Sequence, residues 1–67
     1  MKPQMTSTNF TCEQLEKCAK RELSYRRRVY PRLVRTEAMS QETANREIAM
    51  MSAIAKWFED INQPKLL

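Results

Sequence analysis

Two helix-forming segments separated by only three residues, 37–39, constrain this 67-residue chain more than any other feature. A connection this short places the second helix beside the first and antiparallel to it. The sequence therefore predicts a single all-α domain, an antiparallel helical hairpin with helices over about 11–36 and 41–62. Residues 1–9 are mostly polar and lack periodicity, so residues 1–10 are expected to form a flexible tail, and residues 63–67 a C-terminal tail.

Capping residues mark where both helices begin. Thr11 is expected to be the N-cap of the first helix, with Gln14 three residues later completing a capping box. Ser40 is expected to cap the second helix, with Glu42 in its positively charged first turn. Pro64 is expected to stop that helix, because proline cannot continue the hydrogen-bond ladder and biases the preceding residue away from helix.

Pro31 conflicts with the first helix. Inside a helix it removes the bond to the carbonyl of Arg27 and costs about 3 kcal/mol. The helix therefore either kinks near Arg27 or ends near Val29. The kink is favoured, because Leu33 and Val34 continue the apolar stripe without a break in phase.

Each expected helix carries apolar residues at helical spacing, which predicts that the two stripes face each other. In the second helix the spacing is that of a coiled-coil seam. Leu23 and Tyr25 are expected at the edges of the first stripe. The stripes comprise Leu15, Ala19, Val29, Tyr30 and Leu33 in the first helix, and Ala44, Ile48, Met51, Ala55 and Phe58 in the second.

Charged residues interrupt the first stripe. Glu22 and Arg26 are four residues apart with the acid first, the favourable order for an ion pair on a helix. Glu47 lies at the border of the second stripe and could join them. The group is either a partly exposed ion pair at a helix edge or a polar layer in an oligomer core that fixes the register. In both interpretations the group of Glu22, Arg26 and Glu47 has a structural role and not a catalytic one.

A second set of large apolar residues lies on another side of the second helix. A chain this small usually needs a partner subunit to bury enough surface. This set therefore favours a homodimer that completes a four-helix bundle, and the alternative is a docking surface for a different protein. The residues are Met50, Ile54, Trp57 and Ile61.

Basic residues concentrate in the first helix. The chain has a net charge of +4, and eight of its twelve Lys and Arg residues lie within 17–35. Five of the eight fall within about 60° of arc opposite the apolar stripe, at 100° per residue. We call these five residues the basic ridge: Lys17, Arg21, Arg28, Arg32 and Arg35.

The basic ridge has three interpretations: a solvated helix face, a docking site for an acidic protein face, and a nucleic-acid contact. Recognisable helix-turn-helix, zinc-finger or basic-zipper patterns are absent, which argues against sequence-specific DNA binding. Tyr25 and Tyr30 could stack on bases, but both are expected near the packed side. Binding to an acidic protein is favoured over nucleic acid. Membrane binding is disfavoured, because Glu22 and Arg26 break the apolar stripe.

The residue types argue against enzyme chemistry. The chain contains no histidine and no glycine, so it lacks the commonest general base and metal ligand and cannot form a glycine-rich phosphate loop. We therefore expect no catalytic residue, no metal site and no cofactor. Cys12 and Cys18 are too far apart on one helix for a disulfide, and reduced, partly buried thiols are favoured over an intermolecular bridge or a reactive thiol. With no membrane span and no signal peptide, a cytoplasmic location is expected.

Several segments resemble a group of small bacteriophage and prophage proteins. They are CAKREL (18–23), RRVYPR (27–32), MSQETA (39–44) and REIAMMSAI (46–54). The group has a basic helix with an Arg-Val-Tyr-Pro motif, followed by a Met-Ser or Met-Thr helix start and an acidic and apolar second helix. The resemblance covers about residues 18–58.

The resemblance implies a phage origin, a place in the bacterial cytoplasm and an accessory role. Such proteins usually carry a glycine in the turn between the helices, where this chain has Glu37 and Ala38. We therefore expect a non-enzymatic phage accessory protein that binds and modulates a host or phage protein with an acidic face, in nucleic-acid metabolism or defence. The alternatives are a nucleic-acid-binding protein that is not sequence-specific and an assembly factor of the virion.

Overall fold

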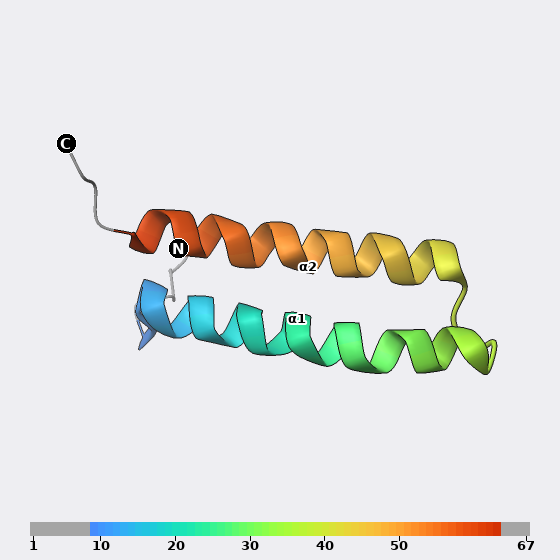
Figure 1. The fold of residues 1–67 in the computed structure, drawn as a ribbon. Helices are drawn as coiled ribbons and strands as arrows, with labels where there is room; N and C mark the ends of the chain where they lie inside the picture. The colour runs from blue at the N-terminus through green and yellow to red at the C-terminus, as the bar shows by residue number, and fades with distance from the viewer. Residues whose placement is uncertain (1–8, 64–67) are drawn as a thin grey trace, which may run out of the picture.

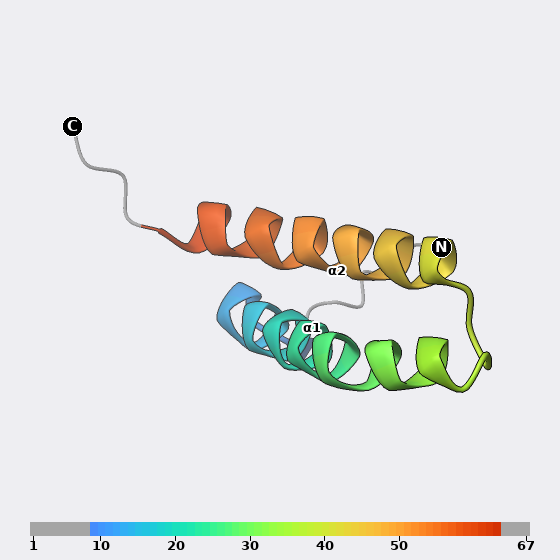
Figure 2. The same cartoon turned by 45° about the vertical axis from the view of Figure 1, so that its right-hand side comes forward.

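The computed structural model describes residues 9–63, which form two helices, α1 (Cys12–Arg35) and α2 (Gln41–Asn62). The helices lie side by side, run in opposite directions and are joined by one short turn (Figures 1 and 2). This confirms the expected all-α helical hairpin. The expected tails lie outside the described residues except at 9–10 and 63. Within 9–63, neither helix is long and apolar enough to cross a membrane.

Both helices begin at the expected caps. The Thr11 amide donates to Gln14 Oε1 over 2.8 Å and the Gln14 amide donates to Thr11 Oγ1 over 3.0 Å, which completes the capping box. At α2, the Thr43 amide donates to Ser40 Oγ over 3.0 Å. These bonds satisfy amides that the first turn of a helix leaves unpaired. At the other end of α2, Gln63 is extended, with φ −78° and ψ 139°, as expected before a proline.

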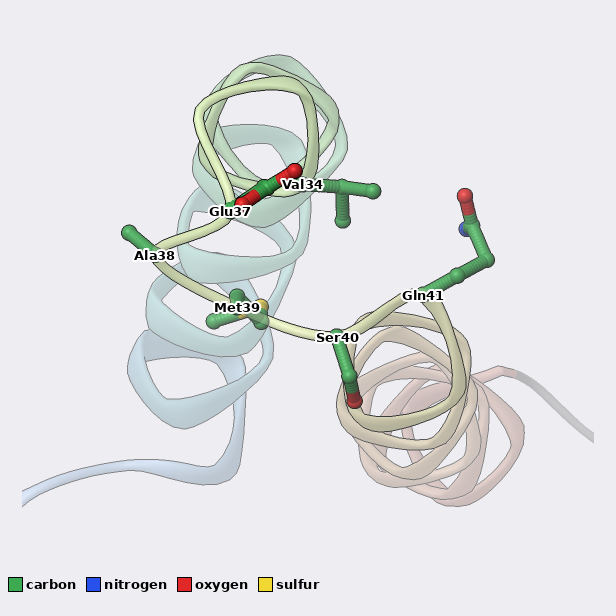
Figure 3. Close-up of a pocket in the computed structure, with 6 residues that line it drawn as sticks. All are labelled: Val34, Glu37, Ala38, Met39, Ser40 and Gln41. Carbon is green, nitrogen blue, oxygen red and sulfur yellow. The ribbon is translucent and has the colours of Figure 1, made fainter.

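The turn between the helices is a Schellman motif. The Glu37 amide donates to the Val34 carbonyl over 3.0 Å, and the Ala38 amide donates to the Leu33 carbonyl over 2.9 Å. This motif requires a left-handed residue after the helix, and Glu37 takes that position with φ 63°. Figure 3 shows Ala38 pointing away from both helices and the Ser40 side chain turned toward the first turn of α2. A motif that usually uses glycine is therefore made here by glutamate.

Replacing Glu37 with glycine should stabilise the protein. The left-handed conformation costs a non-glycine residue about 1–2 kcal/mol, so Glu37→Gly is expected to raise the free energy of unfolding by about 1 kcal/mol. Ala38→Gly is the matched control, because Glu37 alone among the described residues has a positive φ. The control is expected to lower stability. Urea unfolding followed by circular dichroism measures both, and equal midpoints for the two variants would contradict the strain at Glu37.

Pro31 lies inside α1, which continues without interruption to Arg35. The alternative that the helix ends near Val29 is therefore wrong. In Figure 2 the first turns of α1 are seen obliquely and overlap, whereas its last turns are seen more from the side, so the helix axis changes direction along its length. A bend is the usual consequence of a proline within a helix.

The contact between the helices is made largely by small residues. Ala19, Leu23 and Ala55 form the buried cluster, and the half-buried Ile48 and Met51 pack against it. The expectation that Leu23 lies at the edge of the stripe is wrong. Leu23 follows Ala19 by four residues, and these two are the buried residues of α1, whereas the other members of the expected stripe, Leu15, Val29, Tyr30 and Leu33, are half-buried.

The open end of the hairpin is tied by Asn62. Its Nδ2 donates to the Cys12 carbonyl over 3.0 Å and to Glu16 Oε1 over 2.8 Å. The other Glu16 oxygen pairs with Lys20 Nζ at 2.7 Å. Hydrogen bonds from Lys20 and then from Asn62 lower the pKa of the Glu16 carboxyl below its ordinary value. The Glu16 carboxylate therefore links one turn of α1 to the last residue of α2.

The hairpin should lose stability in acid through Glu16. A carboxyl whose pKa is lower in the folded state contributes stability above its ordinary pKa, and this contribution disappears as the pH falls through the folded value. The free energy of unfolding should therefore decrease below about pH 5. Glu16→Gln should make this decrease smaller, because glutamine has no carboxyl group to protonate. Urea unfolding between about pH 6 and pH 3 provides the measurement, and identical pH profiles for the wild type and Glu16→Gln would refute the role of Glu16.

Candidate functional site

A polar cluster joins the middle of the two helices. Arg26 Nε donates to Glu22 Oε2 over 3.0 Å, and Arg26 Nη1 donates to the Glu47 carbonyl oxygen over 2.8 Å. Nη1 also lies 3.5 Å from Glu47 Oε1. The hydrogen bond to Glu22 is the main cause that raises the pKa of Arg26 above its ordinary value. The structure thus brings together all three residues that the sequence singled out.

In the single chain this cluster is only partly shielded from water. The Arg26 side chain is 21 % exposed, while those of Glu22 and Glu47 are 43 % and 33 % exposed. Arg26 nevertheless contributes more to the structure than a surface ion pair would. Its hydrogen bond to the Glu47 backbone carbonyl of α2 fixes the position of the two helices relative to each other. The cluster therefore has a structural role, which is to join α1 to α2.

α2 carries a line of exposed apolar side chains, separate from the two stripes that face each other between the helices. From here on, this exposed line is called the apolar stripe. Its members are four, three and four residues apart, so they follow one side of the helix. The Trp57 ring meets only the edge of Phe58, with ring centroids 5.1 Å apart and planes at 80°, and remains 60 % exposed. The stripe consists of Met50, Ile54, Trp57 and Ile61, all at least 45 % exposed.

The two broad faces of the hairpin differ in character. A shallow groove on one face is lined by polar residues of both helices around Leu23 and Ala55. At 100° per residue, the apolar stripe lies on the other side of α2 from this groove. The half-buried Leu15 and Val29 of α1 lie on that same side. The hairpin therefore has one polar face and one apolar face. The polar groove residues are Lys20, Ser24, Arg27, Ser52, Lys56 and Glu59.

The basic ridge lies on the side of α1 that is turned away from α2. All five of its residues, Lys17, Arg21, Arg28, Arg32 and Arg35, are exposed. The ion pairs between residues 9–63 use Lys20, Arg26 and Lys56 as their cations, and none uses a ridge residue. The ridge cations therefore form no ion pair within the described part of the chain.

Tyr25 is exposed and lies beside the basic ridge, so the expectation that it lies near the packed side is wrong. It lies four residues after Arg21 and three before Arg28, and it is 46 % exposed. Arg28 Cζ lies 5.9 Å from the centroid of its ring, within the range of a cation–π contact. The position of Tyr25 is predicted wrongly from periodicity because tyrosine is treated there as an apolar residue. A tyrosine ring can also remain exposed to water beside a guanidinium group. Tyr30 is half-buried, near the packed side as expected.

An open groove adjoins the start of the ridge. It has a volume of about 530 Å³, and the ring of Phe10, which is 62 % exposed, forms part of its wall. Cys18 also lines it, and both Cys12 and Cys18 are free and exposed, not partly buried as expected. The thiols lie outside the core because the first turns of α1 place only Ala19 fully against α2. The lining residues are Phe10, Gln14, Leu15, Lys17, Cys18 and Arg21.

No group of three Cys, Asp or Glu side chains within residues 9–63 is placed to hold a metal ion. Comparison of the chain with models of known protein families, with curated proteins and with solved structures finds no match. The two exposed surfaces, the basic ridge and the apolar stripe, are therefore the features from which a function can be inferred.

Proposed function

We propose that this chain is a non-enzymatic phage accessory protein. In this proposal it forms a homodimer through the apolar stripe and uses the basic ridge to bind and modulate a host or phage component that carries an acidic surface. The observation that carries the proposal is the ridge itself, five exposed cations without an ion-pair partner among the described residues. The phage origin and the bacterial cytoplasm rest on the sequence resemblance over residues 18–58.

The small core supports self-association. Leu23 is the one buried residue of the described chain larger than alanine, while four large apolar residues of α2 remain in water. A second hairpin packed on the same face would cover the apolar stripe and complete a four-helix bundle. In that arrangement the cluster of Glu22, Arg26 and Glu47 would lie near the interface, where a polar layer fixes register.

The wild-type protein is expected to sediment as a dimer of about 16 kDa, twice the 8.0 kDa of one chain, at tens of micromolar. Ile54→Glu should shift it to the monomer, because the substitution puts a charge into the contact. Ala49→Glu adds the same charge to an exposed position of α2 away from the stripe and should remain dimeric. Sedimentation equilibrium measures all three, and a wild-type mass of one chain would refute the dimer.

Two classes of acidic partner fit the ridge by charge, an acidic protein face and nucleic acid. The preference for a protein partner rests in part on the expectation that both tyrosines lie near the packed side. The exposure of Tyr25 within the ridge changes this balance, because aromatic rings among cations are typical of surfaces that bind nucleic acid. Nucleic acid is therefore the candidate with a specific observation in its favour.

The ridge can be tested by removing its charge without changing the fold. Replacing Arg21, Arg28, Arg32 and Arg35 with Gln should preserve the helical signal, because these side chains point away from α2. Binding to a labelled DNA duplex should weaken, and the slope of log affinity against log salt should fall by about 0.9 for each phosphate that the variant no longer neutralises. Fluorescence anisotropy across a salt series provides the measurement.

The control compares two double variants that remove the same charge, Arg28→Gln with Arg32→Gln on the ridge and Arg27→Gln with Arg46→Gln off it. Arg27 and Arg46 are exposed, and neither takes part in an ion pair among the described residues. The off-ridge variant should retain most of the binding. Equal losses of affinity in the two variants would show that total charge, and not the basic ridge, determines binding.

A further inference from the structure

The basic ridge and Tyr25 form one continuous line along α1. Its members are four, four, three, four and three residues apart, which keeps them on one side of a helix. Of the three carboxylates of α1, Glu16 and Glu22 fall at other angles around the helix, and Glu13 lies four residues before Lys17, beyond the N-terminal end of the line. The line is therefore a row of cations with one aromatic ring in its middle. In order, it contains Lys17, Arg21, Tyr25, Arg28, Arg32 and Arg35.

We infer that this line binds single-stranded nucleic acid, with the ridge cations on the phosphates and the Tyr25 ring stacked on an unpaired base. The inference rests on the proposed function, in which the ridge is the binding surface, and names its partner. A phosphodiester strand carries negative charges and flat rings, and the line carries positive charges with one flat ring among them. An acidic protein face would match the cations but would leave the ring without a matching group.

The contact between Arg28 and Tyr25 enlarges the stacking surface. With Cζ 5.9 Å from the ring centroid, the planar guanidinium lies close to the ring and next to the phosphate-binding cations. Guanidinium groups and aromatic rings both stack on bases, and each stacked base contributes a sequence-independent part of the affinity. A single arginine can thus support the ring and contact a neighbouring phosphate.

The shape of the line favours single strands over duplexes. In a duplex the faces of the bases are covered by their neighbours, and only base edges are accessible in the grooves. Tyr25 stands on the convex outside of a helix, so its ring can stack only on a base that has left the stack. Phe10 supplies a second exposed ring, in the groove beside Lys17 and Arg21 at the start of the ridge.

The experiment compares two labelled oligomers of equal length and charge, a 20-nucleotide oligothymidylate and an abasic phosphodiester, by fluorescence anisotropy with the full chain. Tyr25→Leu should weaken binding to oligothymidylate by about fivefold or more, the lower end of the range for one stacked base. Binding to the abasic oligomer should not change. Tyr25→Phe keeps the ring and should bind oligothymidylate as the wild type does. A variant that failed to fold would lose both oligomers, so the abasic strand also controls for folding.

Three outcomes would overturn the inference. The first is an equal effect of Tyr25→Leu on both oligomers, which would remove the stacking role. The second is tighter wild-type binding to a duplex of the same length than to oligothymidylate. The third is tighter binding to an acidic polyglutamate peptide, which would make the partner a protein. If the ridge Gln variant binds oligothymidylate as tightly as the wild type does, the proposed function itself fails, so the two failures are distinguishable.

Discussion

The hairpin depends on the small side chains that α1 and α2 place between them. Ala19, Ala44 and Ala55 are almost fully buried, and Leu23 is the one larger residue that shares this position. Alanines allow two helices to approach closely, but they bury little apolar area, so the contact itself contributes modest stability. Ile48 and Met51 of α2 pack against this contact and stay half-buried. The contact covers only one side of α2, so the apolar stripe, which lies further round the helix, remains exposed.

Polar bonds compensate for this thin interface at two places. Arg26 joins α1 to a backbone carbonyl of α2 near the middle of the hairpin, and Asn62 joins the last residue of α2 to the first turns of α1. Both bonds connect residues far apart in the sequence, so they specify the alignment of the helices. A hydrophobic contact made mainly of alanines would specify that alignment only weakly, because one alanine packs much like the next.

The features that could be predicted from the sequence are those set by local chemistry. Thr11 and Ser40 cap the helices as expected, because a cap depends on a few neighbouring residues. The burial of Leu23 and the bonds of Asn62 could not be predicted, since they depend on how one helix is rotated against the other. Tyr25 was misplaced for a different reason: an amphipathic side chain fits either face of a helix, and only the fold decides which. The sequence therefore predicts the basic ridge of the candidate site, but not the exposure of Tyr25 beside it.

The conformation of Glu37 has a consequence for how the chain can rearrange. If residues 36–40 became helical, the left-handed residue would disappear and α1 and α2 would merge into one long rod, because no glycine interrupts the sequence. The rod would lose the Arg26 and Asn62 bonds and the alanine contact. Two rods laid side by side would recover all of them between chains. Strain in a short hinge favours this exchange of identical elements, known as domain swapping. The turn thus determines whether α2 packs on its own α1 or on that of a neighbour.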